Sequence, residues 1–280
     1  MRYGLTTRLE PVHQWSGASD RPAPIVALHG FTGSGEDFGP LAPLLEREFL
    51  APDLPGHGGA QASMSAASYS MERAVGGLAE LLDRRAAAPA VFMRPVLLGY
   101  SMGGRIALSF AAAFPERLAA LVLVGASPGL ADEEARAARR AADSALADRI
   151  EAEGVLAFAE RWAKHPIIAS QARITQPYLR EMRRRRLGNR PWGLANSLRG
   201  VGTGAMPSVW GALPDLRVPT LLLTGEEDLK FRGIAREMRA LMPEARHEVI
   251  PGAGHCAHLE RPEATAAAIQ TFLDAISSEE

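Results

Sequence analysis

The sequence predicts an α/β protein: a mostly parallel central sheet flanked by helices, with an inserted helical lid. Short apolar runs that end in turn residues alternate with segments whose apolar residues recur at helical spacing. Such alternation is typical of a parallel sheet covered on both faces. Within residues 127–205 the alternation stops while helical spacing continues, and it resumes afterwards. We therefore expect a single domain over 1–280, with a core of 1–126 and 206–280 and a lid of about 127–205.

The first half of the chain supplies most of the expected core elements. One or two weak edge strands end near Asp20-Arg21-Pro22. The run 24–28 is short, wholly apolar and stopped by His29-Gly30, which indicates a buried strand running into a turn. The same criteria predict strands at 49–54, 95–99 and 118–125, and helices at 40–48, 68–86 and 103–114.

The second half adds the lid and the last strands. Residues 127–205 hold 13 arginines and one lysine against nine acidic residues, a formal net charge of +5, so the rest of the chain sums to −6. Strands are expected at 218–224 and 247–250, and a closing helix at 262–276. Because sites in open parallel sheets form at the carboxyl ends of the strands, we expect the lid to cover that edge.

The composition argues against several classes of protein. The formal net charge of −1 gives no global attraction for nucleic acid or for a membrane surface. A single cysteine, Cys256, excludes an internal disulfide and suits a reducing compartment. The N-terminus MRYGLTTRLE lacks the apolar core of a signal peptide, and no uncharged apolar run has the length of a membrane span, so we expect a cytoplasmic protein. The sequence contains no metal-ligand cluster or phosphate loop, so no metal and no cofactor are expected; the oligomeric state is left open.

A candidate nucleophile lies between a strand and a helix. The segment Gly99-Tyr100-Ser101-Met102-Gly103 is a G-x-S-x-G motif directly after an apolar strand and before a helical stretch. That context is typical of a serine on a tight turn, with the helix N-terminus directing N–H groups toward developing negative charge. The alternative is a glycine-rich turn with an incidental serine.

Two backbone N–H groups are candidates for an oxyanion hole. One belongs to the residue after the nucleophile, Met102, and the other comes from the loop after an earlier strand. The segment His29-Gly30-Phe31-Thr32-Gly33 fits that loop, with Phe31 as the donor. A plain turn is the alternative interpretation of this loop.

An acid and a histidine follow Ser101 in the order that such a triad requires. Asp228 ends the turn GEED just past an expected strand, and its place at the loop apex favours it over Glu226 and Glu227. His255 ends the glycine-rich loop PGAGH after the next strand, where it would take the serine proton. The competing histidine, His258, is expected to have a capping or packing role.

These residues, in this order, resemble the α/β-hydrolase superfamily across nearly the whole chain, which implies the α/β-hydrolase fold. Additional motifs are more specific. They are DLPGHG at 53–58, Gly104-Arg105, LANSLRG at 194–200 with GTG at 202–204 and PSVW at 207–210, and GEEDLKF at 225–231 with AGHCAHLE at 253–260. Together they resemble the 2-succinyl-6-hydroxy-2,4-cyclohexadiene-1-carboxylate synthase family of menaquinone (vitamin K2) biosynthesis.

The resemblance implies a lyase that does not hydrolyse an ester. The family removes a proton from a cyclohexene substrate, 2-succinyl-5-enolpyruvyl-6-hydroxy-3-cyclohexene-1-carboxylate, and expels its enol-linked pyruvate. Ser101 would be the base, polarised by His255, and Asp228 would hold the histidine tautomer. The oxyanion hole would stabilise charge delocalised onto a substrate carbonyl oxygen.

The resemblance also implies a pocket for a small anionic substrate with three carboxylates. It assigns substrate binding to Arg105, Arg139 and Arg186, with Tyr100 and Trp162 as further pocket residues. The net charge of the lid agrees with an anionic substrate, although for most lid arginines a solvated helical face is the simpler explanation. The four consecutive arginines that end at Arg186 leave its register open.

Two alternative functions would use the same constellation. A hydrolase (an esterase, lactonase or carbon–carbon bond hydrolase) would use Ser101 as a nucleophile, and a ligand-binding receptor would use the fold with slow or no turnover. The basic lid and the segment 194–210 favour the synthase. The chain departs from the family at Met206 and Cys256, where glutamine and asparagine are usual. Neither departure touches the triad, and both bear on pocket polarity.

Overall fold

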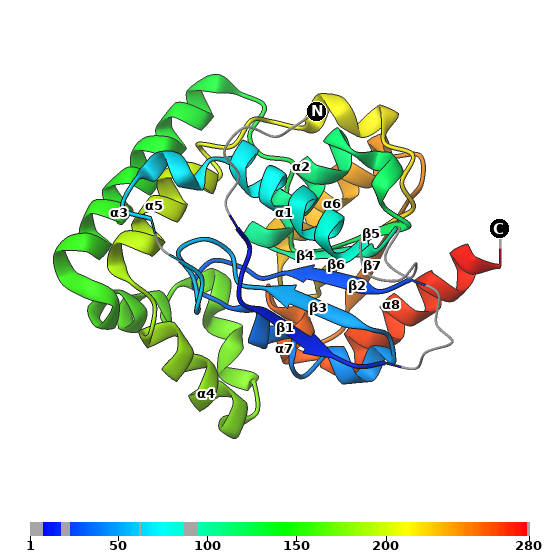
Figure 1. The fold of residues 1–280 in the computed structure, drawn as a ribbon, viewed down its shortest axis with the longest axis horizontal. Coiled ribbons are helices and arrows are strands. Elements are labelled where there is room, and N and C mark those ends of the chain that lie inside the picture. Colours follow the sequence, from blue (N-terminus) through cyan, green and yellow to red (C-terminus); the bar gives the residue numbers. More distant parts are fainter. Residues whose placement is uncertain (1–7, 18–22, 62, 87–93, 279–280) are drawn as a thin grey trace.

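The centre of the molecule is one sheet of seven strands in the order β1-β3-β2-β4-β5-β6-β7 (Figure 1). The computed structural model describes residues 8–17, 23–61, 63–86 and 94–278. The strands are β1 (Val12–Trp15), β2 (Ile25–Leu28), β3 (Phe49–Pro52), β4 (Val96–Tyr100), β5 (Ala120–Val124), β6 (Thr220–Gly225) and β7 (Ala245–Ile250). Only β1 pairs antiparallel, with β3, so the predicted mostly parallel sheet is confirmed.

The inner strands are apolar because both faces of the sheet are covered. Every residue of β2, β3, β4, β5 and β6 is buried, whereas the edge strands β1 and β7 are partly exposed. In the register, Gly99 stands opposite Leu28 on one side and Leu123 on the other. The loops that follow β2, β4 and β5 therefore leave the sheet side by side.

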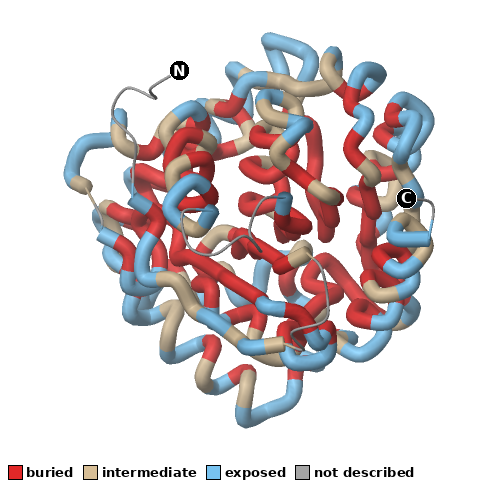
Figure 2. Tube along the Cα trace, turned by 45° about the vertical axis from the view of Figure 1, so that its right-hand side comes forward, coloured by how far each residue is buried: buried red, intermediate tan, exposed pale blue. Residues whose placement is uncertain are grey.

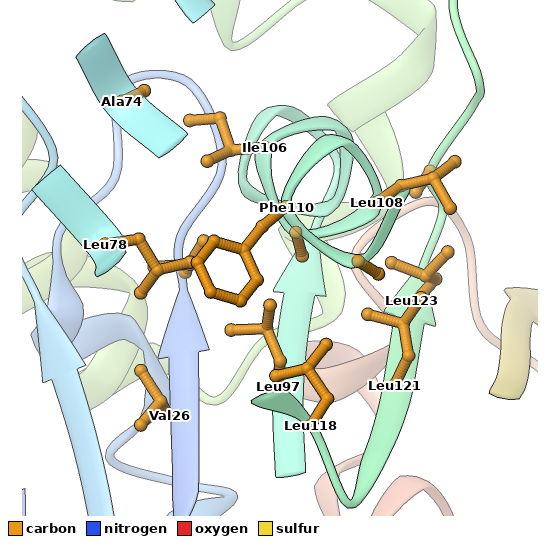
Figure 3. Close-up of a cluster of buried hydrophobic side chains, with 14 of the residues drawn as sticks. Val26, Ala74, Leu78, Leu97, Ile106, Leu108, Phe110, Leu118, Leu121 and Leu123 are labelled. Carbon is orange, nitrogen blue, oxygen red and sulfur yellow. The ribbon is translucent and has the colours of Figure 1, made fainter. Parts of the chain in front are cut away.

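Helices form a layer on each face of the sheet (Figure 1). On one face α1 (Met71–Ala86), α2 (Met102–Ala113) and α6 (Leu229–Leu241) share a core with the strands, and on the other α7 (Ala257–Glu260) and α8 (Pro262–Ser277) do the same. Figure 3 shows Phe110 of α2 lying over Leu97 of β4 and beside Leu78 of α1. The buried residues concentrate inside, with exposed chain at the periphery (Figure 2).

The helical insertion lies between β5 and β6. It contains α3 (Glu133–Trp162), the 3-10 helix η5 (Pro166–Arg173), α4 (Gln176–Leu187) and α5 (Pro191–Val201), which gather on one side of the sheet (Figure 1). We call residues 127–205 the lid. Helix α3 is broken at Gly154, whose φ of 80° and ψ of 170° are not helical. The division of the chain into a core and this lid remains a prediction.

Some predicted elements differ from the observed ones. The helix expected at 40–48 is only a 3-10 turn, Ala42–Leu45, because a proline lies in it and Glu46 adopts a left-handed φ of 50° that ends it. Helix α6 was not predicted, although its buried residues Phe231, Ala235 and Met238 recur at helical spacing. Of the expected N-terminal strands the structure shows β1, and residues 18–22 lie outside the described residues. Among the helices described, none has the length and hydropathy to cross a membrane.

His13 connects edge strand β1 to the segments that contain Glu36 and Asp53. Its Nε2 lies 3.1 Å from Asp53 Oδ1, and its Nδ1 lies 3.8 Å from Glu36 Oε1. The hydrogen bond to Asp53 raises the pKa of His13, more than burial lowers it. The buried Asp53 carboxylate also accepts hydrogen bonds from Gly35 N (2.7 Å) and Gly59 N (2.7 Å), so one side chain joins three segments of the core.

Replacing His13 by glutamine is expected to destabilise the protein in acid more than in alkali. A group whose pKa is raised on folding contributes stability that is fully present below its unfolded pKa, near 6.5, and is lost as the pH rises through the folded pKa. A charge-assisted hydrogen bond contributes about 1.5–3 kcal/mol. Urea unfolding of both proteins at pH 5.5 and pH 9 measures the difference. An equal loss of unfolding free energy at the two pH values would show that the protonated imidazole adds nothing.

Candidate active site

Ser101 lies on a strained turn between β4 and α2. Its φ of 50° and ψ of −106° are unusual for a residue with a side chain, and its N–H donates to Val124 O at 2.9 Å. The turn requires glycine beside it, because a Cβ on Gly103 would lie 2.0 Å from Leu28 O. The backbone thus places the serine hydroxyl at the carboxyl end of the sheet, as the motif predicts.

Three side chains from three loops form a hydrogen-bonded chain. His255 Nε2 lies 3.0 Å from Ser101 Oγ, and His255 Nδ1 lies 2.6 Å from Asp228 Oδ2. His255 and Asp228 are buried, at 4% and 8% exposure, so water does not compete for the contact between them. In this arrangement Nδ1–H donates to the carboxylate, which leaves Nε2 free to accept the serine proton.

Glu226 and Glu227, the two competing acids, have partners other than His255. Glu227 is exposed, and its Oε2 pairs with Arg173 Nη2 at 2.5 Å, which lowers the pKa of Glu227. Glu226 Oε2 accepts a hydrogen bond from Gly252 N at 2.9 Å. Asp228 alone of the three reaches the imidazole, and it also caps α6 by accepting from Phe231 N at 3.4 Å.

The competing histidine packs inside the protein. His258 is 1% exposed, and its ring centroid lies 4.5 Å from that of Tyr100 and 5.2 Å from that of Phe38. Burial lowers the pKa of His258 to about 3, so the imidazole is neutral. These contacts agree with the packing role expected from the sequence.

The loop after β2 faces Ser101 across a cavity. Phe31 and Met102 both line this cavity. Within the residues described, the N–H of neither Phe31 nor Met102 donates to another protein group. For Met102 the reason is its place at the start of α2, where helical N–H groups lack partners. Both N–H groups are thus free to bind an oxyanion.

The cavity has a volume of about 690 Å³ and is walled by both the core and the lid. The core supplies loop residues from the carboxyl ends of the strands, including Phe31, Ser101 and His255, and the lid supplies α3 and α4 residues. On the lid side the rings of Phe158 and Trp162 stack with centroids 5.7 Å apart, and Phe31 meets both edge to face. One wall is therefore aromatic.

Arg105 and Arg139 both line the cavity and lie close enough for their charges to interact. Arg139 Nε donates to Asp143 Oδ1 at 2.8 Å, which leaves its terminal nitrogens for other partners. Arg105 Nη2 donates to Val201 O at 3.0 Å, while its buried Nε has no hydrogen-bond partner. Burial, with the nearby charge of Arg139, lowers the pKa of Arg105 to about 10, so it stays protonated at neutral pH. Two cations held together in a cavity suit an anionic ligand.

The remaining pocket predictions also lie on the cavity wall. Arg186 lines it, with Nη1 donating to Gln171 Oε1 at 3.0 Å and a buried Nε without a partner. Its neighbour Arg185 instead bonds Asp37 Oδ1 at 2.9 Å, so it is Arg186 that faces the cavity. Tyr100 and Trp162 line the same space. Burial raises the pKa of Tyr100 well above its usual range, so its phenol is neutral.

The cavity wall also includes Lys230, Arg161 and His165, to which sequence reasoning assigned no role. Lys230 lies within the motif GEEDLKF. Its place two residues after Asp228, in the first turn of α6, is the signal that could have found it. Most other lid arginines form surface ion pairs, such as Arg199 with Asp148 and Arg149 with Glu153, and these agree with a solvated face.

Of the two departures from the family pattern, Cys256 lines the cavity and is buried beside His255. Met206 is fully buried against Gly129 and is not among the residues that line the cavity. Burial raises the pKa of Cys256 to about 12, so it is a neutral thiol. In the described part of the chain no three histidine, cysteine or acidic side chains gather as metal ligands would.

Comparison with known proteins gives one consistent result. The sequence model of the "Alpha/beta hydrolase family" matches residues 25–268. A Bacillus subtilis protein named "Putative 2-succinyl-6-hydroxy-2,4-cyclohexadiene-1-carboxylate synthase" is 40% identical over 253 residues, covering 90% of each chain. A structure of MenH from S. aureus superposes with a TM-score of 0.88 and 31% identity, covering 95% of this chain and 98% of that one. A malate-bound thermophilic esterase from Thermogutta terrifontis superposes with a TM-score of 0.76 and 27% identity, over 95% of this chain and 93% of that one.

Proposed function

The chain belongs to the 2-succinyl-6-hydroxy-2,4-cyclohexadiene-1-carboxylate synthase family, on the alpha/beta hydrolase fold, and from this membership we propose the reaction of its site. It is a carbon–oxygen lyase of menaquinone biosynthesis. Its substrate is 2-succinyl-5-enolpyruvyl-6-hydroxy-3-cyclohexene-1-carboxylate, from which it eliminates pyruvate. A cytoplasmic location belongs to the same proposal.

Proton abstraction is assigned to Ser101. His255 Nε2, 3.0 Å from the serine oxygen, takes the hydroxyl proton as that oxygen removes a proton from the ring carbon. Asp228 fixes the tautomer and stabilises the imidazolium across the 2.6 Å contact. The electron pair of the broken carbon–hydrogen bond at C2 forms a C2–C3 double bond, the pair of the existing C3–C4 double bond moves to C4–C5, and the bond from C5 to the enolpyruvyl oxygen breaks. The leaving enolate takes up a proton to become pyruvate.

Charge stabilisation is assigned to the two N–H groups of the oxyanion hole. Loss of the ring proton delocalises negative charge onto the carbonyl oxygen of the succinyl group. The N–H groups of Phe31 and Met102, free of other protein acceptors in the described chain, are suited to bind that oxygen. Preorganised donors of this kind act without reorganisation during the reaction.

One observation carries the choice of a lyase substrate over a simple ester. The cavity that holds Ser101 is also lined by Arg105, Arg139 and Arg186. Guanidinium groups pair with carboxylates, and the three carboxylates of the proposed substrate supply such partners. A neutral ester offers no such groups.

Purified protein is expected to release pyruvate from the proposed substrate without any added cofactor. No step of the mechanism needs a metal or a nucleotide, so dialysis against EDTA should leave the rate unchanged. Pyruvate release is followed by coupling to lactate dehydrogenase, with the ring product followed by its absorbance. If the protein leaves this substrate untouched and rapidly cleaves simple p-nitrophenyl esters, it is a hydrolase that uses Ser101 as a nucleophile.

A further inference from the structure

We propose that Asn189, a lid residue, is a positioning residue that holds the oxyanion loop in its reactive conformation. The oxyanion loop is the segment His29–Gly35 that follows β2. This inference rests on the proposed function, because it assigns the part that the lid plays in that reaction.

Asn189 lies at the corner between α4 and α5 and is 7% exposed. Its side-chain Nδ2 donates to Thr32 O at 3.0 Å and to Arg186 O at 3.1 Å, and its Oδ1 accepts from Gly58 N at 2.9 Å. Two carbonyls on one end of the amide and an N–H on the other fix its orientation. One lid side chain therefore joins two loops of the core.

The contact with Thr32 matters because of the backbone there. Gly33 N donates to Gly30 O at 3.1 Å, so residues 30–33 form a tight turn, and Thr32 has a φ of 70°. That conformation is normal for glycine and strained for a β-branched residue. Such strain persists only where the surroundings hold it, and the hydrogen bond from Asn189 to the Thr32 carbonyl is such a restraint.

Relaxation of Thr32 would displace the reactive donor. Phe31 precedes Thr32, and its N–H is the loop's proposed oxyanion donor. Returning Thr32 to an ordinary φ would rotate the Phe31–Thr32 peptide and move Phe31 with it. Two hydrogen bonds tie the ends of the loop to the core: Leu54 N donates to His29 Nε2 at 2.9 Å, and Gly35 N donates to Asp53 Oδ1 at 2.7 Å. Between them, the Phe31 ring packs against Phe158 and Trp162 of the lid, and Asn189 supplies a hydrogen bond from the lid to the loop backbone.

The corner between α4 and α5 packs closely against the core. A Cβ on Gly193 would lie 2.7 Å from Gly56 O, so the start of α5 meets the 55–59 loop backbone to backbone. Gly58 on that loop donates to Asn189, and Gly59 donates to Asp53 Oδ2 at 2.7 Å. Asn189 thus has a rigid partner on either side, as a positioning group requires.

The chain offers a matched control in Asn196 of α5. Asn196 is also buried, at 4% exposure, and its Nδ2 also faces two carbonyls of a core loop, Ser63 O at 3.5 Å and Met64 O at 3.4 Å. That loop supplies neither the triad nor an oxyanion donor. Replacing each asparagine by aspartate removes the Nδ2 donor and leaves the size of the side chain unchanged.

Steady-state kinetics of pyruvate release distinguish the possible roles. For Asn189→Asp we expect kcat to fall about tenfold to a hundredfold, with KM within about twofold of wild type, since misplaced donors act on the transition state. For Asn196→Asp we expect both constants to stay within about twofold of wild type. Melting curves establish that each variant is folded at the assay temperature. If Asn189→Asp does not fold, Asn189→Ser, which is too short to span both loops and adds no charge, carries the same expectation.

Several outcomes would overturn the assignment. A raised KM with unchanged kcat would make Asn189 an anchor of the lid only. Unchanged constants, or an equal loss of kcat in Asn196→Asp, would show that it has no special link to the loop. A wild-type protein that releases no pyruvate would reject the proposed function instead. The same pair of variants would then be compared on an ester that the wild type cleaves, because ester hydrolysis uses the same oxyanion hole.

Discussion

Replacing Ser101 by alanine should lower the rate of pyruvate release by about 10³-fold or more, and His255→Ala and Asp228→Asn should also be severe. Ser101 and His255 are 3.0 Å apart, and His255 and Asp228 are 2.6 Å apart, so loss of any one disables proton transfer through the chain. Groups that act as a unit are not additive. The double variant of Ser101 and His255 should therefore be little worse than the worse single variant. Turnover measured in single and double variants tests this directly.

Glu227→Gln is the matched control for the acid. Glu227 is adjacent in sequence, yet it pairs with Arg173 on the surface and does not reach the imidazole. We expect this change to alter turnover by less than about threefold, in line with the small contribution of exposed ion pairs. A severe effect of Glu227→Gln together with a benign Asp228→Asn would move the acid to Glu227.

Removing a cavity arginine should weaken catalytic efficiency and leave stability nearly unchanged. A charge-assisted hydrogen bond contributes about 1.5–3 kcal/mol, so Arg139→Ala and Arg105→Ala should each lower kcat/KM by about tenfold to a hundredfold. Lysine keeps the charge and loses the planar fork, so Arg139→Lys should restore only part of the loss. Higher salt should weaken substrate capture, less than for a fully exposed pair.

Arg149 is the matched control on the same helix. Like Arg139, it forms an ion pair four residues along α3, here with Glu153 at 3.8 Å, but it does not line the cavity. Arg149→Ala should leave both kcat/KM and the melting temperature close to wild type. If the cavity variants instead lose several kcal/mol of stability and keep normal efficiency once folded, these arginines support the fold and the argument for an anionic substrate fails.

The parts of the site that depend on local sequence could be predicted. The turn around Ser101 needs glycine within two residues, so its motif is visible in a short window. Asp228 and His255 each follow directly on a strand of the parallel sheet, and the carboxyl ends of such strands share one edge. The strand pattern therefore predicts that both residues lie at the same edge of the sheet.

The parts that depend on helix orientation could not be predicted. Successive helical residues point about 100° apart, so the run Arg183–Arg186 presents its side chains in different directions. Arg184 reaches Glu181 on its own helix, Arg185 reaches Asp37 of the core, and only Arg186 combines the cavity wall with the bond to Gln171. Composition and spacing do not say which face of α4 meets the sheet.

Contacts between loops that are far apart in the sequence could not be predicted either. Asn189 bonds Thr32 across 157 positions of sequence, and Asn189 belongs to none of the catalytic motifs of the sequence. The helix predicted at 40–48 is wrong for a different reason. Apolar spacing over nine residues indicates a helix, but prolines lie among them and the structure has only the 3-10 turn Ala42–Leu45. Sequence periodicity describes faces of elements, and it carries little information on how corners and turns meet.

The break in α3 at Gly154 has a consequence for how this enzyme's selectivity can be altered. The helix before the break carries Arg139 and Asp143, and the short helix after it carries Phe158 and Trp162. A Cβ on Gly154 would meet nothing within 4 Å, so the joint is not wedged by neighbours. The ionic and aromatic parts of the pocket thus lie on two helical segments that are joined at Gly154. Substitutions at Gly154 and its flanks can change the orientation of the segment with Phe158 and Trp162 while Arg139 keeps its contact with the substrate. These positions are therefore a rational library site for substrates with a larger apolar portion.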